Sequence, residues 1–263
     1  MACVLIQNWW ERFNKMPLLW LIGLLFLPAS AMAGTLSWVS SERWVTVAKV
    51  YDGDTFETRK GEKIRLLNVN TPEVQHRDSR AQMGGDEASL ALNALISGQQ
   101  VRLRTDRETK DHYGRTLAQV WMQGGLWVNA WLLNQGYAHM YNFEPNTRWA
   151  KALQAEEKVA REAGLRIWRL PSFKVLDANR VSKSQLGEFR VVKGRVNVSG
   201  LKTWSFQLGT LRVTIPRAYR TYFKQLPDLK GHPKVTIRGK IRVSNKQQLF
   251  MALHSPFDLE IEP

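Results

Sequence analysis

The sequence predicts a mainly β fold with helices, arranged as two small domains. Short stretches in which apolar and polar residues alternate recur along residues 43–122 and again along residues 189–261, and turn-forming residues separate them. Residues 128–134 and 148–163 instead have helical spacing, and a glycine follows each within two positions. At 263 residues and 44% hydrophobic, the chain has room for two small cores, and a charged fraction of 23% is ordinary for a globular protein.

The first domain is expected to begin with two strands joined by a tight AspGlyAsp turn and to continue with a strand over Lys63–Val69. In that third strand Arg65 lies on the opposite face from Ile64 and Leu66, so its side chain can point toward a cleft. Residues 74–86 are polar and contain glycine, which favours a mobile loop beside such a cleft. The other expected elements are strands over 43–50, 55–58, 100–105 and 116–122, and helices over 87–96 (with Asp86 as N-cap), 128–134 and 148–163.

The second domain is expected after a polar connector, residues 171–186. Three strands, a helix and further strands predict a second small OB-like barrel over residues 187–263. The expected strands are 189–198, 203–208, 211–215, 234–243, 249–253 and 258–261, with a helix over 217–226 between the third and the fourth.

The N-terminus has the pattern of an export signal, which we assign to residues 1–33. Arg12 and Lys15 precede an apolar run from Leu18 to Leu27, and small residues follow at Ala31 and Ala33. The pattern predicts a periplasmic or secreted protein, with a short segment 34–42 before the first domain; an uncleaved membrane anchor is the alternative. The only cysteine of the sequence is Cys3, and no histidine pair has a zinc-ligand spacing, so an intrachain disulfide is impossible and zinc is disfavoured.

Positive charge is concentrated in the second domain. Residues 34–170 carry 19 Lys and Arg against 16 Asp and Glu, whereas residues 171–263 carry 17 against 6. A basic module beside a nearly neutral one predicts that the second domain binds nucleic acid, with solubility or attachment to an anionic phospholipid or envelope polymer as alternatives. Aromatics and cations that alternate there could form a binding platform, although Phe206 and Phe250 are expected in the core: Trp204, Phe206, Tyr219, Tyr222 and Phe250 with Lys202, Arg212, Arg217, Arg220, Lys224 and Arg242.

Four residues of the first domain carry the chemistry of phosphodiester cleavage when they are taken together. Asp54 in DGDT can hold a divalent cation, Glu73 in RLLNVNTPE can orient a water, and Arg65 and Arg115 can absorb phosphate charge. Each motif alone has an ordinary structural explanation, such as a hairpin turn for AspGlyAsp or a strand arginine for Arg65. Their joint occurrence within 62 residues favours a nuclease site.

These motifs, with TyrGlyArg at 113–115, ProAsn at 145–146 and LeuArgIleTrp at 165–168, make the stretch from Trp44 to Trp168 resemble the staphylococcal nuclease (thermonuclease) family. The resemblance covers nearly half of the chain. It implies an OB-type five-stranded barrel with helices over residues 43–170 and a Ca²⁺-dependent nuclease that cleaves DNA and RNA. Small bacterial OB modules appended to such nucleases resemble the second domain at the level of pattern.

The resemblance also implies roles for individual residues. Asp54, the side-chain oxygen of Asn70 and the carbonyl of Thr71 would hold the metal, while Arg65, Glu73 and Arg115 would act on the phosphate and the attacking water. Asn70 stands where the family has a second carboxylate, which should weaken the site by one charge. Substrate contacts are expected at His112, Tyr113, Tyr141 and Phe143; aromatic faces stack on unpaired bases and so favour single strands, and ordinary packing is the alternative for Tyr141 and Phe143.

Two functions from different classes therefore remain open from the sequence. The first is an exported Ca²⁺-dependent nuclease with DNA and RNA as substrates and no obligate protein partner. The second is a catalytically impaired tandem OB protein that binds nucleic acid, which Asn70 alone favours. Membrane association is expected only if residues 1–33 are not removed.

Overall fold

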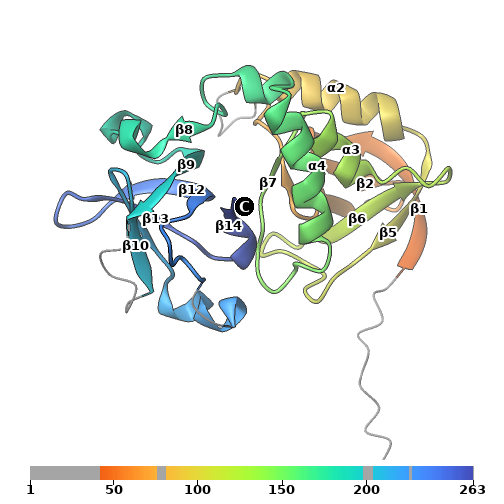
Figure 1. Ribbon diagram of the computed structural model, residues 1–263. Helices are drawn as coiled ribbons and strands as arrows, with labels where there is room; N and C mark the ends of the chain where they lie inside the picture. Colours follow the sequence, from red (N-terminus) through yellow and green to blue (C-terminus); the bar gives the residue numbers. More distant parts are fainter. Residues whose placement is uncertain (1–41, 76–80, 198–203, 225–226, 263) are drawn as a thin grey trace, which may run out of the picture. The chain divides into compact units, whose positions relative to one another are not determined.

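Two five-stranded β-barrels make up most of the structure, a computed structural model that describes residues 42–75, 81–197, 204–224 and 227–262 (Figure 1). The predicted signal segment 1–33, part of the predicted loop 74–86, and Lys202 lie outside the described residues. Among the residues that are described, no helix is long and apolar enough to cross a membrane. The described residues all belong to one compact unit.

The first barrel closes in the strand order β1-β2-β3-β6-β5, with β5 pairing back onto β1. All neighbours are antiparallel except β3 and β6, which run parallel. Ile64 and Leu66 of β3 point into the core with Phe56, so the alternation expected around Arg65 is confirmed. The strands are β1 (Glu42–Val50), β2 (Thr55–Thr58), β3 (Lys63–Leu66), β5 (Gln100–Arg104) and β6 (Thr116–Met122).

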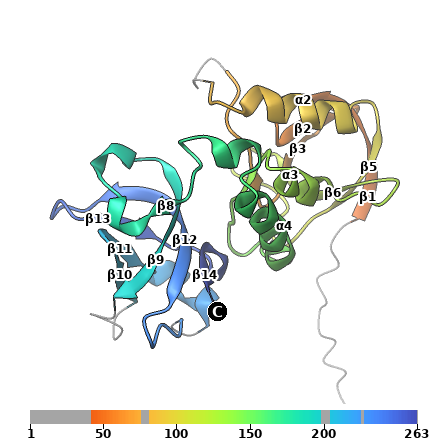
Figure 2. The same cartoon turned by 45° about the horizontal axis from the view of Figure 1, so that its top comes forward.

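Three helices complete this domain: α2 (Gly85–Ile96), α3 (Val128–Asn134) and α4 (Ala150–Glu162). Figures 1 and 2 show α2 beside the barrel strands, where Leu92 and Ile96 enter the core. In α4 the buried positions are Leu153, Glu157 and Ala160, as expected for a packing face, except that Glu157 is buried in place of Glu156.

Two details of this domain differ from the sequence prediction. The strand expected over Lys63–Val69 ends at Leu66, because Asn68 takes a left-handed φ of 64° that breaks the extended chain. A separate pair then forms between β4 (Val69–Asn70) and β7 (His139–Met140). The expected N-cap Asp86 lies instead in the first turn of α2, and Gly84, with φ 91°, precedes the helix because that backbone region suits glycine.

The second barrel has the same connectivity as the first. Its circuit is β9-β10-β11-β13-β12, closed by the pairing of β12 with β9, and again the third strand runs parallel to the fifth. The two domains therefore share the OB strand order, which confirms the expected fold class. The elements are β9 (Phe189–Asn197), β10 (Ser205–Leu208), β11 (Leu211–Thr214), β12 (Lys234–Val243), β13 (Leu249–Ala252) and β14 (Leu259–Ile261), with 3₁₀ turns at Arg217–Phe223 and Pro256–Asp258.

The stretch expected to be a polar connector is part of this second core. Within residues 171–186, β8 (Leu176–Asp177) pairs with β9, and Ala178 and Val181 are buried among the barrel side chains. A Thr210 hydroxyl that donates to the carbonyls of Ala178 and Val181 fixes this segment. The helix expected over residues 217–226 is a 3₁₀ turn that ends at Phe223.

A buried cluster of four charges joins β12 and β14 to helix α4. Arg238 is 1% exposed and lies 2.6 Å from the carboxylate of Glu157, which is itself fully buried. Arg161 lies 2.6 Å from Glu260 and 3.3 Å from Glu157, and Arg238 also pairs with Glu260. Glu157 accepts, in addition, the backbone N–H of Met140 at 2.7 Å, so the cluster reaches the strand that carries His139.

We expect Arg238→Met to lower the free energy of unfolding by about 3–5 kcal/mol, because it leaves Glu157 buried with one incomplete partner. The double variant Arg238→Met/Glu157→Gln should recover much of that loss, since no buried carboxylate then lacks its cation. Urea unfolding followed by circular dichroism measures both. Lys158→Met removes the exposed Lys158–Glu162 pair on the same helix and should cost less than about 1 kcal/mol; an equal loss in both single variants would contradict the role given to burial.

Candidate active site

A cavity of about 500 Å³ opens where the AspGlyAsp turn, the segment after β3, the loop before β6 and the loop after β7 meet. Nine of the ten residues singled out in the sequence line it: Asp54, Arg65, Asn70, Thr71, Glu73, His112, Arg115, Tyr141 and Phe143. Tyr113 is not among the lining residues and is 74% exposed. Asp52, Glu108, Lys110 and Asp111, which the sequence analysis did not single out, line the cavity as well.

The turn between β1 and β2 holds Asp54 in a buried position. The Asp52 carboxylate accepts the backbone N–H of Asp54 at 2.9 Å, and a Cβ at Gly53 would lie 2.6 Å from Ala88 of α2, so only glycine fits between the turn and the helix. The Asp54 carboxylate accepts the backbone N–H of Thr71 at 3.0 Å. Burial, and then the adjacent charge of Asp54, raise the pKa of Asp52 to about 6.

Arg65 is held by four acceptors. One terminal nitrogen donates to the carbonyls of Leu66 and Val69, each at 2.7 Å, and the other donates to Asn70 Oδ1 at 2.9 Å. The second nitrogen also lies 3.0 Å from Asp54 Oδ2. The guanidinium is therefore fixed at the end of β3 by the carbonyls that the left-handed turn at Asn68 leaves without strand partners.

The neighbour of Asn70 is a histidine that fixes how its amide is oriented. His139 is fully buried, and burial lowers the pKa of His139 to about 4, so the ring is neutral near pH 7. Its Nδ1 lies 3.0 Å from the Met140 carbonyl and must donate there, which leaves Nε2 as an acceptor 3.4 Å from the Asn70 amide nitrogen. That amide nitrogen also donates to the Thr71 carbonyl at 3.1 Å. The Asn70 oxygen expected on a metal thus faces Arg65.

The donor atoms of the cavity fit a hard cation such as Ca²⁺, although by a different set from the one expected. Asp54, Asp52 and the Thr71 carbonyl all offer oxygen. The raised pKa of Asp52 shows two carboxylates whose repulsion a cation would relieve. Among the described residues no group of three or more His, Cys, Asp or Glu side chains is placed to hold a metal, so any site here depends on carbonyl and water oxygens as well.

Glu73 follows Pro72 and lines the cavity with an exposed side chain. Its backbone is held from behind, because its N–H donates to Gln82 Oε1 at 3.2 Å and its carbonyl accepts the Gln82 N–H at 2.8 Å. A Cβ at Gly85 would lie 2.5 Å from the Glu73 carbonyl oxygen. The GlyGly of the expected mobile loop therefore begins a helix and allows close approach to the Glu73 backbone.

Arg115 is anchored by Asp111, within the DHYGR motif. The Asp111 carboxylate accepts Arg115 Nε at 2.7 Å, and its other oxygen accepts the backbone N–H of Arg115 at 2.9 Å and of Tyr113 at 3.0 Å. Tyr113 stacks under the Arg115 guanidinium at 5.4 Å and against His112 at 3.8 Å between ring centroids. The motif thus fixes one arginine with a single carboxylate, a role that the i, i+4 spacing could have indicated.

Tyr141 and Phe143 form an exposed aromatic edge of the cavity. Their rings meet edge to face, with centroids 4.6 Å apart, and Phe143 is 57% exposed. Buried amides beneath them fix the loop: Asn68 Nδ2 donates to the Asn146 carbonyl at 2.8 Å, and Asn146 exchanges hydrogen bonds with the Glu108 backbone. The degree of exposure of Phe143 does not fit ordinary core packing.

We expect Asn70→Asp to lower the free energy of unfolding by about 1–3 kcal/mol, because a carboxylate oxygen would then face the unprotonated Nε2 of His139 in a buried place. The double variant Asn70→Asp/His139→Gln restores a donor opposite the carboxylate and should regain most of the stability. Chemical unfolding at pH 7 in the presence of a chelator measures this without a contribution from metal. Full stability of the single variant would mean that the amide orientation described above is wrong.

Comparison with known proteins agrees with this geometry. The family described as "Staphylococcal nuclease homologue" matches residues 63–170. The chain is 38% identical over 125 residues to "Thermonuclease" of Staphylococcus intermedius, which is 46% of this chain and 74% of that protein. It is 33% identical over 132 residues to "Thermonuclease" of Staphylococcus hyicus (49% and 78%) and 34% identical over 129 residues to "Endonuclease YncB" of Bacillus subtilis (47% and 61%). The chain belongs to the staphylococcal nuclease family.

Proposed function

We propose that this chain hydrolyses the phosphodiester bonds of DNA and RNA in a Ca²⁺-dependent reaction, with the 5′-oxygen as leaving group. The observation that carries the proposal is that Asp54, Arg65, Glu73 and Arg115 line one cavity. Homology to thermonucleases and endonucleases supports a nuclease, and members of the family use Ca²⁺. A purely binding protein would not require all four groups at one place.

The cation would be held by Asp54 and the Thr71 carbonyl, with Asp52 beside them, in a set that lacks the Asn70 oxygen. When bound, it supplies positive charge to the phosphate oxygens and lowers the pKa of a bound water. Asp54 and Arg65 neutralise each other at 3.0 Å in the structure. A cation on Asp54 would replace that pairing and free an N–H of Arg65 for the substrate.

Arg65 and Arg115 would bind the non-bridging oxygens, and their forked donors match a phosphate whose charge increases toward the transition state. Both guanidiniums are already oriented by protein acceptors, so little reorganisation is needed when the charge develops. Glu73 has an exposed carboxylate in the same cavity and would position the attacking water or accept its proton. Arg115 would also stabilise the departing 5′-oxygen.

The competing function is an impaired enzyme that binds nucleic acid without cleaving it. One feature favours it: the Asn70 oxygen is engaged by Arg65 and does not face the Thr71 carbonyl. Turnover by the purified protein separates the two functions. Single- and double-stranded DNA and RNA with Ca²⁺, with Mg²⁺ or with chelator also establish the metal and the strand preference, for which we propose single strands.

We expect Arg65→Lys, Arg115→Lys and Glu73→Gln each to lower kcat by about 10²–10³-fold and to change KM far less, because their contacts strengthen in the transition state. Lysine cannot reproduce the forked donors. Steady-state hydrolysis of single-stranded DNA measures all three. The matched control is Arg43→Lys, an exposed arginine of the same barrel that pairs with Glu62 outside the cavity; it should keep wild-type kcat. Wild-type turnover in both cavity arginine variants would remove them from the chemistry.

We also propose that the protein is exported, with residues 1–33 as its signal and mature residues arranged as 43–170 and a basic domain 187–263. The support is the sequence pattern alone. N-terminal sequencing of the protein recovered from a bacterial periplasm or medium should give a start near Gly34. Recovery only in the membrane fraction with an intact N-terminus would indicate an anchor.

A further inference from the structure

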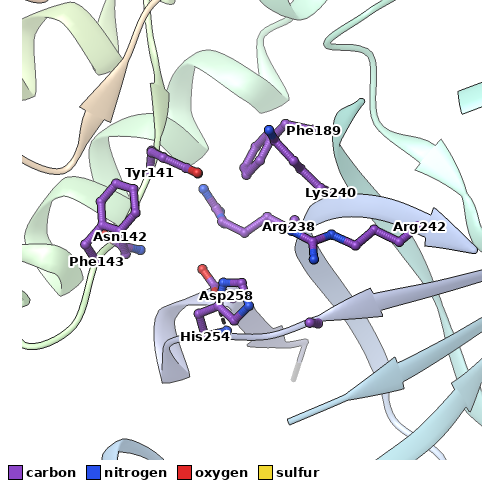
Figure 3. Close-up of a pocket in the computed structure, with 11 residues that line it drawn as sticks. Tyr141, Asn142, Phe143, Phe189, Arg238, Lys240, Arg242, His254 and Asp258 are labelled. Carbon is purple, nitrogen blue, oxygen red and sulfur yellow. Dashed lines mark hydrogen bonds between the residues drawn. The ribbon is translucent and has the colours of Figure 1, made fainter. Parts of the chain in front are cut away.

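A second, smaller hollow of about 60 Å³ lies beside the candidate active site and shares two side chains with it. Tyr141 and Phe143 line both cavities. Figure 3 shows Tyr141, Phe143, Phe189, Arg242 and His254 around the second hollow, on segments from both domains. The two aromatic side chains therefore form a common wall between the cavity that contains Asp54 and a surface of the basic domain.

The strand β12 gives this hollow its charge. Val235, Ile237 and Ile241 point into the barrel core, so Arg238, Lys240 and Arg242 lie on the outer face. Arg238 is neutralised by Glu157 and Glu260, whereas Lys240 and Arg242 are exposed and have no ion-pair partner among the described residues. Two free cations thus stand side by side on the strand that lines the hollow.

The single carboxylate among the lining residues, Asp258, opposes these cations only in part. It is 8% exposed and accepts the backbone N–H groups of His254 and Ser255 at 2.8 and 2.9 Å. Burial raises the pKa of Asp258 to about 6. The exposed side chains of the hollow are therefore cationic or aromatic.

Tyr141 is close to the cations of both cavities. Burial, and next the charge of Asp258, raise the pKa of Tyr141, while Arg65 on one side and Arg242 on the other each act to lower it. On the second-barrel side the ring of His254 lies 4.5 Å from the ring of Tyr219. Aromatic faces consequently continue from the loop after β7 to the end of β13.

We propose that a single-stranded polynucleotide bound at the candidate active site continues over Tyr141 and Phe143 into the second hollow, where Lys240 and Arg242 bind its backbone phosphates. This inference rests on the proposed nuclease function and extends it to a substrate path across both barrels. Exposed aromatic edges can stack on bases only when the bases are unpaired, so the path selects single strands. The second domain then increases affinity for longer chains and performs no cleavage.

The test compares oligothymidylates of two to twelve nucleotides by fluorescence anisotropy, in chelator so that none is cut. Wild type should bind longer chains more tightly, and Lys240→Gln/Arg242→Gln should lose that gain, at least about tenfold for the twelve-mer, while dinucleotide affinity stays unchanged. Its salt dependence should also fall, because each lost phosphate contact on a single strand lowers the slope of log K against log salt by about 0.7.

The matched control is Arg212→Gln/Lys230→Gln, which removes two exposed cations of the same barrel that do not line the hollow. It should keep both the length dependence and the slope. Equal losses in the two double variants would show a diffuse charge effect and overturn the path, as would wild-type binding that does not increase beyond the dinucleotide. Thermal unfolding confirms that both double variants are folded.

Two further measurements separate this inference from other outcomes. Hydrolysis of a short chromogenic phosphodiester with Ca²⁺ tests the nuclease function alone, and the Lys240→Gln/Arg242→Gln variant should match wild type there. A wild type that is inactive but keeps the length dependence would overturn hydrolysis and support the path. Vesicles of phosphatidylglycerol that bind equally well and displace the twelve-mer would assign Lys240 and Arg242 to an anionic lipid surface and overturn the path.

Discussion

The position of Arg65 is the constraint on which the candidate active site depends. Strand β3 ends one residue after Arg65, and the chain turns at Asn68, so the carbonyls of Leu66 and Val69 meet the same guanidinium. The other face of the guanidinium reaches Asp54 and Asn70, which come from the turn before β2 and from β4. One side chain thereby connects three chain segments around the cavity, and the geometry of Asp54 cannot change independently of it.

This arrangement was predictable from the sequence only in part. The alternation of Ile64, Arg65 and Leu66 sufficed to place Arg65 opposite the core, because a strand has a period of two residues. The end of β3 was not predictable in the same way, since Asn68 adopts its left-handed φ with the support of Gln119 and Asn146, which lie far along the chain. The same limit applies to Ala178 and Val181, whose polar neighbours indicated a connector although a barrel covers them.

The shared strand order of the two barrels explains why one can be catalytic and the other cannot. In the first barrel, the carboxylates lie in and just after the turn between the first two strands, and the arginine lies on the third strand. In the second barrel, the third strand carries Arg212, but no acidic cluster that could hold a metal lies among its described residues. Its charge is instead gathered as cations on the outer face of β12, which suits binding to a polyanion.

The identity of residue 70 is physically linked to the second barrel. Phe189, at the start of β9, stacks on the ring of His139 at 4.4 Å between centroids, and Phe173 lies 5.6 Å away, so the second domain completes the burial of that histidine. A buried imidazole is neutral, and with Nδ1 donating to Met140 it presents a lone pair toward residue 70. An amide can donate to that lone pair, whereas a carboxylate can only repel it. In a chain that packs a second barrel against His139, asparagine is therefore the residue that the environment favours at position 70, and a carboxylate there would require the histidine to carry a buried proton.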